Sequence, residues 1–389
     1  MVFSADVAKR VLVIQPTLTP TGGGEGVCAW ILETLKGEYE TTLLVWEAPD
    51  LAAIDRFFGT SLQRGPLPVR IAFPRWPRWL KRARFARRFK HWLLLAEGRR
   101  VPAIDLRISV DEESDLGGSG IQYVHYPRLQ SLARARAGEA ASLRLRLLGV
   151  IHRLMARVAG FSVERMRRNV TIVNSDWTGT RVQALHAIAT TTIHPPAVGP
   201  FPEQPWAERK TAFVCVGRLA PEKRLEWVIE IVRSVRAAGH DVSLTIVASA
   251  GDAAYGARIA ALARAAGSWV SIERALSRSE LAALLGSHRY GLHGMAEEHF
   301  GMAVAEMVAA GMIPFVPAGG GQREIVDDER LQWTTQSEAV ARIVQVLGDP
   351  ALQESLRAHL ASRKAHLAPA RFVAEFRALV AQAIATPTV

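Results

Sequence analysis

The sequence predicts an α/β protein with two domains, each built on a doubly wound parallel sheet. Three observations lead to this prediction. The chain has 389 residues, too many for one hydrophobic core and about right for two. Short apolar or β-branched runs alternate with helical patterns, as in parallel sheets that are covered by helices on both faces. A proline-rich stretch without periodicity, residues 194–205, separates the two series of elements.

The first half of the chain starts with a strand, a glycine loop and a helix. The strand is expected at 10–14, the loop contains Gly22, Gly23 and Gly24, and the helical pattern runs through Leu35. Further buried strands are expected at 41–46, 103–110, 121–124 and 170–173. We place the first domain at residues 1–195.

The same alternation restarts after the proline-rich stretch and defines a second domain at 196–366. A helix is expected at 221–238, with Pro221 at its opening and Gly239 just beyond its end. Strands are expected at 212–216, 242–248, 269–272 and 313–316. The last segment, 367–389, carries apolar residues at helical spacing and is expected to be an amphipathic helix.

Composition limits the classes of protein and points to an anionic partner. The formal net charge is +11, and basic residues concentrate in the aromatic-rich segment 75–90 and in 134–168. Both segments have the pattern of amphipathic helices, which suits an anionic membrane, a nucleic acid or simply a helix packed on the protein core. No nucleic-acid-binding motif is found, so no nucleic acid is expected as a partner.

Cysteine content and hydropathy indicate the compartment. The chain has two cysteines, which give neither a disulfide framework nor a zinc pattern. No apolar stretch approaches the roughly 20 residues that cross a bilayer. We therefore expect a cytoplasmic protein, with peripheral attachment to the inner face of the membrane as the alternative.

Three motifs follow strands and suit the binding of an anion. The loop that contains Gly23 and Gly24 precedes a helix, whose first N–H groups are free to bind a phosphate. Arg218 and Lys223 lie between a strand and a helix, and both can reach one diphosphate. Glu298 lies before a helix that is expected to open near Phe300, and Glu306 lies within it. The N–H groups at this helix start would bind a diphosphate, with Glu306 at the ribose and Glu298 at the sugar hydroxyls.

The spacing of Glu298 and Glu306 resembles the E-x7-E motif of glycosyltransferase family 4, which comprises retaining enzymes with the GT-B fold. Other segments resemble landmarks of that family in the same order along nearly the whole chain: Gly22 to Glu25, His125 to Pro127, Asn174 to Thr178, the Arg218/Lys223 loop and Gly320 to Val326. His125 to Pro127 and Leu292 to Gly301 look most like the α-1,2-mannosyltransferases that extend dolichol-linked oligosaccharides. In two respects the chain departs from these relatives, because Gly26 replaces a frequent basic residue and no transmembrane anchor is seen.

The resemblance implies two Rossmann-like domains with a cleft between them, 1–195 on the acceptor side and 196–366 on the nucleotide-sugar side. It also implies that 367–389 packs back on the N-terminal domain. The implied activity is transfer of a hexose, with mannose as the best match, to a hydroxyl of a glycan, a lipid-linked sugar or a small molecule. GDP-mannose is the favoured donor, and a UDP-sugar is the second choice.

Specific residues take roles from this resemblance. His125 would contact the transferred sugar, and Glu298 is the second catalytic side chain. No D-x-D metal site is found, so Arg218 and Lys223 are expected to neutralise the leaving diphosphate without a metal and without a cofactor. The remaining donor-binding residues are expected to be Gly23, Gly24, Phe300, Gly301, Met302 and Glu306.

Two other functions fit the same sequence. A nucleotide-sugar epimerase of the GT-B fold would bind the same donor and need no acceptor. A basic protein without catalytic activity would use this fold to bind a membrane or a nucleic acid.

Overall fold

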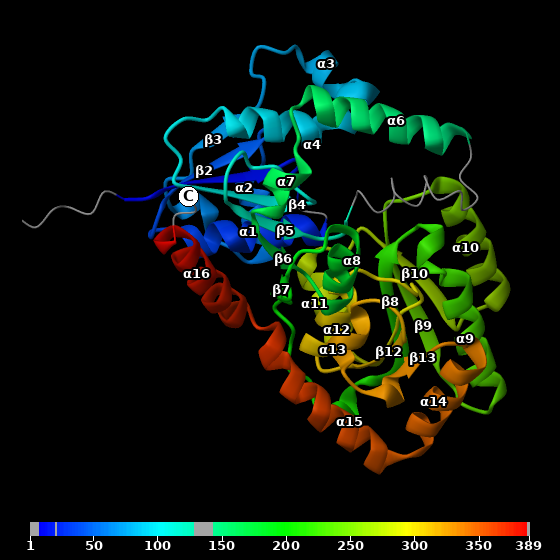
Figure 1. Cartoon of the computed structure of the whole chain (residues 1–389). Coiled ribbons are helices and arrows are strands. Elements are labelled where there is room, and N and C mark those ends of the chain that lie inside the picture. Colours follow the sequence, from blue (N-terminus) through cyan, green and yellow to red (C-terminus); the bar gives the residue numbers. More distant parts are fainter. Residues whose placement is uncertain (1–7, 20–21, 128–142, 387–389) are drawn as a thin grey trace, which may run out of the picture. The chain divides into compact units, whose positions relative to one another are not determined.

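The computed structural model describes residues 8–19, 22–127 and 143–386 and divides the chain into two compact units. The first unit comprises Met1–Ile193 together with Phe372–Val389, and the second comprises His194–Arg371. Each unit is a parallel sheet with helices on its faces (Figure 1). The predicted α/β class with two doubly wound parallel sheets is therefore confirmed.

The first sheet has the strand order β3-β2-β1-β4-β5-β6-β7, and its strand pairs are parallel. The strands are β1 Arg10–Gln15, β2 Glu40–Val45, β3 Val69–Ile71, β4 Leu106–Asp111, β5 Ile121–Val124, β6 Val170–Val173 and β7 Thr191–Thr192. The helices described in this unit are α1 Gly23–Leu35, α2 Leu51–Phe58, α3 Arg78–Arg82, α4 Arg84–Arg99, α6 Leu143–Val158, α7 Val163–Arg167, α8 Asp176–His186 and the greater part of α16 Pro369–Ala385. Because the chain order reverses between β1 and β4, a ligand is expected to bind at the carboxyl ends of these two strands.

The first sheet is buried on both faces, because successive side chains of a strand point to opposite sides. Val11 and Val13 of β1 join a core cluster with α1, α2 and α16. Leu12 and Ile14 of the same strand join a second cluster with α4 and α6. This arrangement explains why the first strand is apolar at every internal position.

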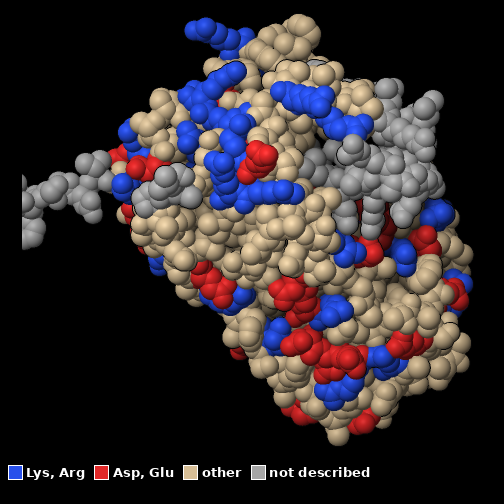
Figure 2. All heavy atoms as spheres, viewed as in Figure 1, with Lys and Arg blue, Asp and Glu red and all other residues tan. Residues whose placement is uncertain are grey.

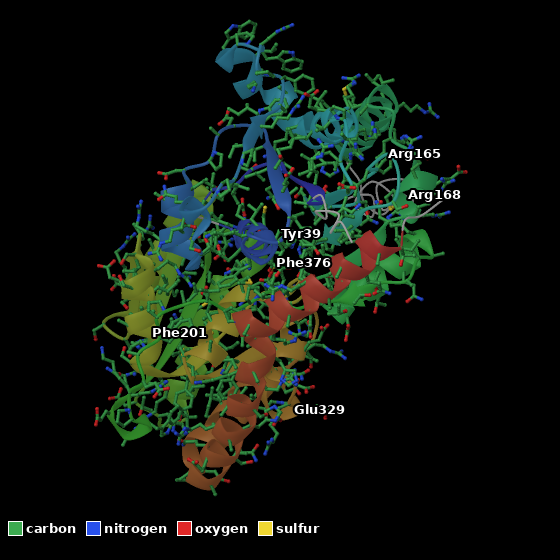
Figure 3. The ribbon with its side chains drawn as sticks, turned by 90° about the vertical axis from the view of Figure 1, so that its left-hand side faces the viewer. Tyr39, Arg165, Arg168, Phe201, Glu329 and Phe376 are labelled. Carbon is green, nitrogen blue, oxygen red and sulfur yellow. The ribbon has the colours of Figure 1, made fainter. Side chains whose placement is uncertain are left out.

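The C-terminal helix α16 supplies part of the first unit's core. Phe372, Phe376 and Val380 are fully buried in the cluster that contains α1, and Tyr39 packs against the same cluster (Figure 3). These three positions are four residues apart, so they lie on one face of the helix. The buried face is the amphipathic pattern seen in the sequence.

The second sheet has the order β10-β9-β8-β11-β12-β13, again with parallel pairs. Its strands are β8 Lys210–Arg218, β9 Ser243–Ser249, β10 Val270–Arg274, β11 His288–Leu292, β12 Ile313–Pro317 and β13 Gln332–Trp333. Its helices are α9 Leu225–Ala237, α10 Ala253–Ala266, α11 Arg278–Gly286, α12 Met302–Ala309, α13 Gln322–Val326, α14 Gln336–Gly348 and α15 Pro350–Arg363. Here the chain order reverses between β8 and β11, which is the expected ligand edge of this unit.

Some elements differ from those predicted. The strand expected at 103–110 begins only at Leu106, and Ala103 has a φ of 55°, outside the extended region. The helix expected at 221–238 is broken at Arg224, which has a φ of 47°, so a 3-10 turn precedes α9. Strand β11 was not predicted, because His288–Leu292 lacks a β-branched run.

The basic aromatic segment 75–90 and the residues after it form α3 and α4, and some of its aromatic side chains pack on the protein core. Phe89 and Trp92 are each 2% exposed and belong to the core cluster beneath α4. Trp79 is 72% exposed. The side chains of Arg82, Arg84, Phe85, Arg87 and Arg88 lie outside the described part of the structure, as does the stretch 134–142 of the second basic region.

Within the described ranges, the helices are all too short or too polar to span a bilayer.

Candidate functional site

Three side chains of the second unit meet where the chain order of the sheet reverses. Lys223, in the turn after β8, forms an ion pair through Nζ with Oε2 of Glu298. Nε2 of His293, the residue after β11, lies 3.3 Å from the same oxygen. The side chains of Lys223 and Glu298 are 15% and 17% exposed, so the pair is largely buried yet open to a ligand.

The carboxyl group of Glu298 is held in its charged form. Burial opposes the charge, but the hydrogen bond from His293 and the positive charge of Lys223 outweigh this effect and lower its pKa well below the usual range. The surroundings of Glu298 therefore favour its carboxylate form. It can accept hydrogen bonds from hydroxyl groups such as those of a sugar.

The backbone around these side chains is closely packed. A Cβ on Gly294 would lie 2.5 Å from the carbonyl oxygen of Lys223, so a larger residue would push the two loops apart. Gln322 is fully buried, and its Nε2 donates to the carbonyl oxygens of Met295 at 3.2 Å and Pro317 at 3.1 Å. The loop that carries Glu298 is thus held from both sides.

Arg218 and Lys223 occupy different environments. Arg218 ends β8, its side chain is 65% exposed, and its Nη2 lies 3.3 Å from Oε1 of Glu222. The break at Arg224 turns Lys223 toward Glu298 instead. The structure therefore joins Lys223 with Glu298 and leaves the guanidinium of Arg218 on the surface of the same loop.

Helix α12 begins two residues later than expected. Gly301 has a φ of 111°, in the left-handed region that favours glycine, and caps the helix that starts at Met302. Phe300 is 3% exposed and packs in the core of the second unit, so its ring does not face a ligand at the surface. The first N–H groups of the helix have no intrahelical acceptor, which suits a phosphate.

Glu306 is buried inside α12, and its carboxyl group is paired with Arg278. Nη1 of Arg278 donates to Oε1 of Glu306 at 2.8 Å. Burial raises the pKa of Glu306, and the charge of Arg278 opposes this shift. Glu298 thus precedes α12 and Glu306 lies inside it. The pKa of Glu298 is lowered, whereas that of Glu306 is raised.

The candidate residues of the first unit also meet at the carboxyl edge of their sheet. Gly23 and Gly24 form the first turn of α1, and His125 follows β5. A Cβ on Gly24 would lie 3.1 Å from Nε2 of His125, so glycine allows this close approach. Nδ2 of Asn174 donates to the carbonyl oxygen of His125 at 3.0 Å. The glycine loop and the histidine, 101 positions apart in sequence, are neighbours in the fold.

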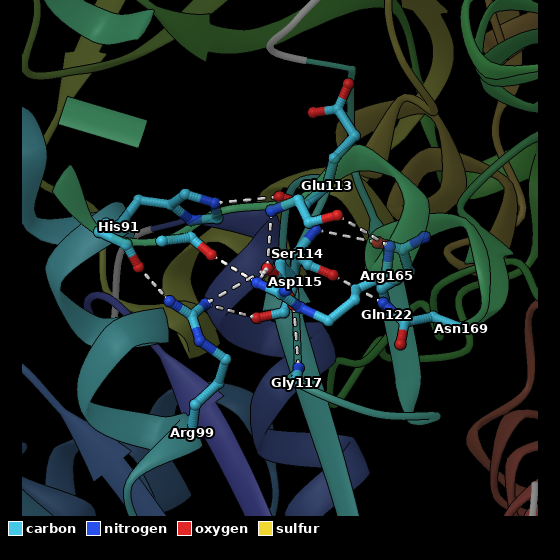
Figure 4. A network of polar contacts seen from close by, with 12 residues as sticks. His91, Arg99, Glu113, Ser114, Asp115, Gly117, Gln122, Arg165 and Asn169 are labelled. Atoms are coloured by element: carbon cyan, nitrogen blue, oxygen red, sulfur yellow. Dashed lines mark hydrogen bonds and ion pairs between the residues drawn. The ribbon is translucent and has the colours of Figure 1, made fainter. Parts of the chain in front are cut away.

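A buried polar network fixes the loop after β4 (Figure 4). The N–H of His125 donates to the carbonyl oxygen of Asp111, the last residue of β4, at 3.2 Å. Asp115 accepts hydrogen bonds from Arg165 at 2.6 Å and 3.0 Å and from the N–H of Ser162 at 2.7 Å. Nδ1 of His91 lies 3.2 Å from Oδ2 of Asp111, and its Nε2 lies 3.1 Å from the carbonyl oxygen of Glu113. Since both ring nitrogens of His91 have protein partners, we assign this network a role in shaping the loop.

Sequence reasoning gave no role to His293 or Arg278. His293 lies in Leu292 to Gly301, a segment that resembles the family, so this resemblance could have indicated a role for His293. Arg278 lies 28 positions before Glu306 and on another helix, and no pattern in the sequence links the two.

The family model described as "Glycosyl transferases group 1" matches residues 200–364. This segment, less than half of the chain, is similar to that family. It contains β8 to α15 and therefore Lys223, His293, Glu298, Arg278 and Glu306. The match confirms the predicted resemblance to glycosyltransferase family 4.

Curated relatives carry a mannosyltransferase name. The "GDP-Man:Man(3)GlcNAc(2)-PP-Dol alpha-1,2-mannosyltransferase" of Mus musculus is 28% identical over 172 residues, which are 40% of this chain and 35% of the relative. The protein of that name from Dictyostelium discoideum is 23% identical over 243 residues, 54% of this chain and 48% of the relative. The chain thus spans between a third and a half of the length of these relatives.

Solved structures with the same fold cover nearly the whole chain. The Anabaena protein Alr3699/HepE in complex with UDP and glucose matches with a TM-score of 0.67 at 15% identity, over 97% of this chain and 99% of that one. WaaG, a glycosyltransferase involved in lipopolysaccharide biosynthesis, matches with a TM-score of 0.68 at 14% identity, over 94% and 99% of the two chains. The predicted GT-B fold is confirmed.

Proposed function

We propose that this protein is a retaining glycosyltransferase that moves a hexose from a nucleoside diphosphate sugar to an acceptor hydroxyl. The observation that carries the proposal is the cluster of Lys223, His293 and Glu298 beside the start of α12, in a segment similar to the glycosyl transferases group 1 family. Such a site offers a cation and N–H groups to a leaving diphosphate and a carboxylate to a sugar. These are the charges that sugar transfer requires.

We propose mannose from GDP-mannose as the first choice of donor. The names of the curated relatives support this choice. The Anabaena structure contains UDP and glucose, so a UDP-sugar is the second choice of donor. The acceptor would be a hydroxyl of a glycan, a lipid-linked sugar or a small molecule. Neither a metal nor a cofactor is required by this mechanism, because Lys223 and Arg218 supply the positive charge.

A thermal-shift panel of nucleotide sugars tests the donor. A ligand at about 100 times its Kd stabilises the folded state by roughly 2.7 kcal/mol, which raises Tm measurably. The panel contains GDP-mannose, UDP-glucose, UDP-N-acetylglucosamine and the free diphosphates. Stabilisation by none of them would contradict the proposal, and isomerised donor formed without an acceptor would favour an epimerase.

In the first unit we propose His125 as a catalytic residue that contacts the transferred sugar. The resemblance to family 4 supports this role, and so does the close approach of Gly24 in the glycine loop. His125→Ala is expected to lower turnover and to leave the affinity for free nucleotide unchanged. Loss of nucleotide affinity with parental turnover would contradict the role.

We also propose that the first unit docks on an anionic membrane through α6. On the face seen in Figure 2, lysine and arginine side chains gather over this unit, whereas acidic and basic side chains alternate on the second. Val150, Leu154 and Val158 of α6 are 51%, 56% and 72% exposed. They are four residues apart and form one apolar stripe, with Arg153 and Arg157 exposed beside it.

Removing this stripe is expected to weaken membrane binding. The variant Val150→Ser/Leu154→Ser/Val158→Ser loses about 1 kcal/mol of apolar transfer per residue, or roughly 100-fold in partitioning. The measurement is co-sedimentation with liposomes, with and without anionic lipid, at low and high salt. Val69→Ser, an exposed valine on β3, is the control. If the parent does not sediment with anionic liposomes at low salt, the docking proposal is wrong.

A further inference from the structure

Arg278, the first residue of α11, joins two parts of the second unit that are distant in sequence. Its Nη1 donates to Oε1 of Glu306 at 2.8 Å, and its Nη2 donates to the carbonyl oxygen of Val198. The side chains of Arg278 and Glu306 are 16% and 11% exposed. Both terminal nitrogens of this largely buried guanidinium therefore have an acceptor.

This contact engages only one oxygen of Glu306. Among the residues that the structure describes, none donates a hydrogen bond to Oε2. A carboxylate accepts through both oxygens, so Oε2 remains available to a hydroxyl group of a ligand. The orientation of that oxygen is set by the guanidinium that holds the other one.

Arg278 also affects the charge of Glu306. Burial raises the pKa of this carboxyl group, and the charge of Arg278 is the opposing effect. Without the guanidinium the pKa of this buried carboxyl group would rise further, and in the protonated form one of its oxygens becomes a donor. Charge and orientation of Glu306 thus depend on the same partner.

We infer that Arg278 is a positioning residue for the ribose of the donor nucleotide. It holds Oε1 of Glu306 so that Oε2 accepts from a ribose hydroxyl. The inference rests on the proposed function, which places the ribose at Glu306. The anchor at Val198 explains why an arginine suits this position, because a lysine keeps the charge but has no planar pair of donors for two acceptors.

The test compares each nucleoside diphosphate with its 2′,3′-dideoxy form. Dissociation constants for GDP, UDP and their dideoxy forms are measured by calorimetry on the full chain. The parent is expected to prefer the ribose form by about 10- to 100-fold, the range for a hydrogen bond to a charged group. Arg278→Ala and Glu306→Gln are both expected to lose most of this preference and to bind the dideoxy form as the parent does.

Three further variants complete the experiment. Arg278→Lys is expected to recover part of the preference, since it restores the charge but not the second donor. Arg278→Gln replaces the alanine variant if that variant does not fold, and it is also expected to lose the preference. Arg233→Ala removes an exposed arginine that pairs with Glu230 and is expected to behave as the parent does.

The outcomes separate this inference from the function on which it rests. If Glu306→Gln loses the preference and both Arg278→Ala and Arg278→Gln keep it, the role of Arg278 is wrong and the ribose assignment stands. If the parent shows no preference, or Glu306→Gln keeps it, the ribose assignment is wrong and the role of Arg278 is wrong with it.

Discussion

Replacing Lys223 by alanine is expected to lower kcat by about 100-fold or more, the loss seen when a preorganised group that stabilises the transition state is removed. Lys223 is the cation that the structure places against Glu298, in a site shielded from much of the solvent. This cation would stabilise the negative charge that develops on a leaving diphosphate, and no water would have to reorient first. A 100-fold loss corresponds to about 2.7 kcal/mol of transition-state stabilisation.

The rate is measured with the donor that the thermal-shift panel identifies. Arg218→Ala is expected to lower kcat on the same scale, although its side chain is far more exposed. Lys9→Ala is the matched control, because Lys9 also pairs with a carboxylate, Asp105, at 3.3 Å but belongs to the first unit. Parental turnover in the Lys223 variant would show that the diphosphate is neutralised in another way.

A chelator gives an independent check of the same mechanism. If Lys223 and Arg218 replace a metal ion, EDTA is expected to leave the rate unchanged. Activity that EDTA abolishes and magnesium or manganese restores would contradict the metal-independent mechanism.

Periodicity and strand composition were sufficient for much of the fold, because both sheets are buried on two faces and their central strands are apolar throughout. They were not sufficient for β11, in which His288, Arg289 and Gly291 break the apolar pattern. They also did not predict the turn at Arg224. Its backbone is left-handed, but the position holds neither glycine nor asparagine, the residues that usually indicate such a turn. That turn brings Lys223 to Glu298, so the missed feature is part of the candidate site.

The amphipathic pattern of the basic segment predicted helices but not which aromatic side chains are exposed. Phe89 and Trp92 lie on the buried face of α4, and the exposed apolar stripe lies on α6 instead. A basic helix on a protein core and one on a membrane have the same periodicity. Only the packing of α4 against β1 and β2 in the structure shows that this helix lies on the protein core.

Replacing Glu298 by glutamine is expected to reduce turnover with the intact donor while free GDP or UDP still binds with the parental affinity. Glutamine has nearly the same shape, but it lacks the negative charge that His293 and Lys223 stabilise. Glu306→Gln is expected instead to weaken free nucleotide and nucleotide sugar alike. The measurements are kcat with the intact donor and Kd for the free diphosphate. Equal loss of diphosphate affinity in the two variants would reject the assignment of Glu298 to the sugar and Glu306 to the ribose.

The lowered pKa of Glu298 also predicts how this variant depends on pH. A carboxyl group whose pKa is lower in the folded state stabilises the fold above its unfolded-state pKa, about 4.3, and this contribution is lost as the pH falls through the folded-state pKa. The Tm of Glu298→Gln should therefore lie furthest below that of the parent near neutral pH, and the gap should narrow in acid below about pH 4. Thermal melts of both proteins between pH 3 and pH 8 measure this gap. A gap that widens in acid would mean that the carboxylate is not stabilised by Lys223 and His293, and the site would then lack the charge on which sugar binding is proposed to depend.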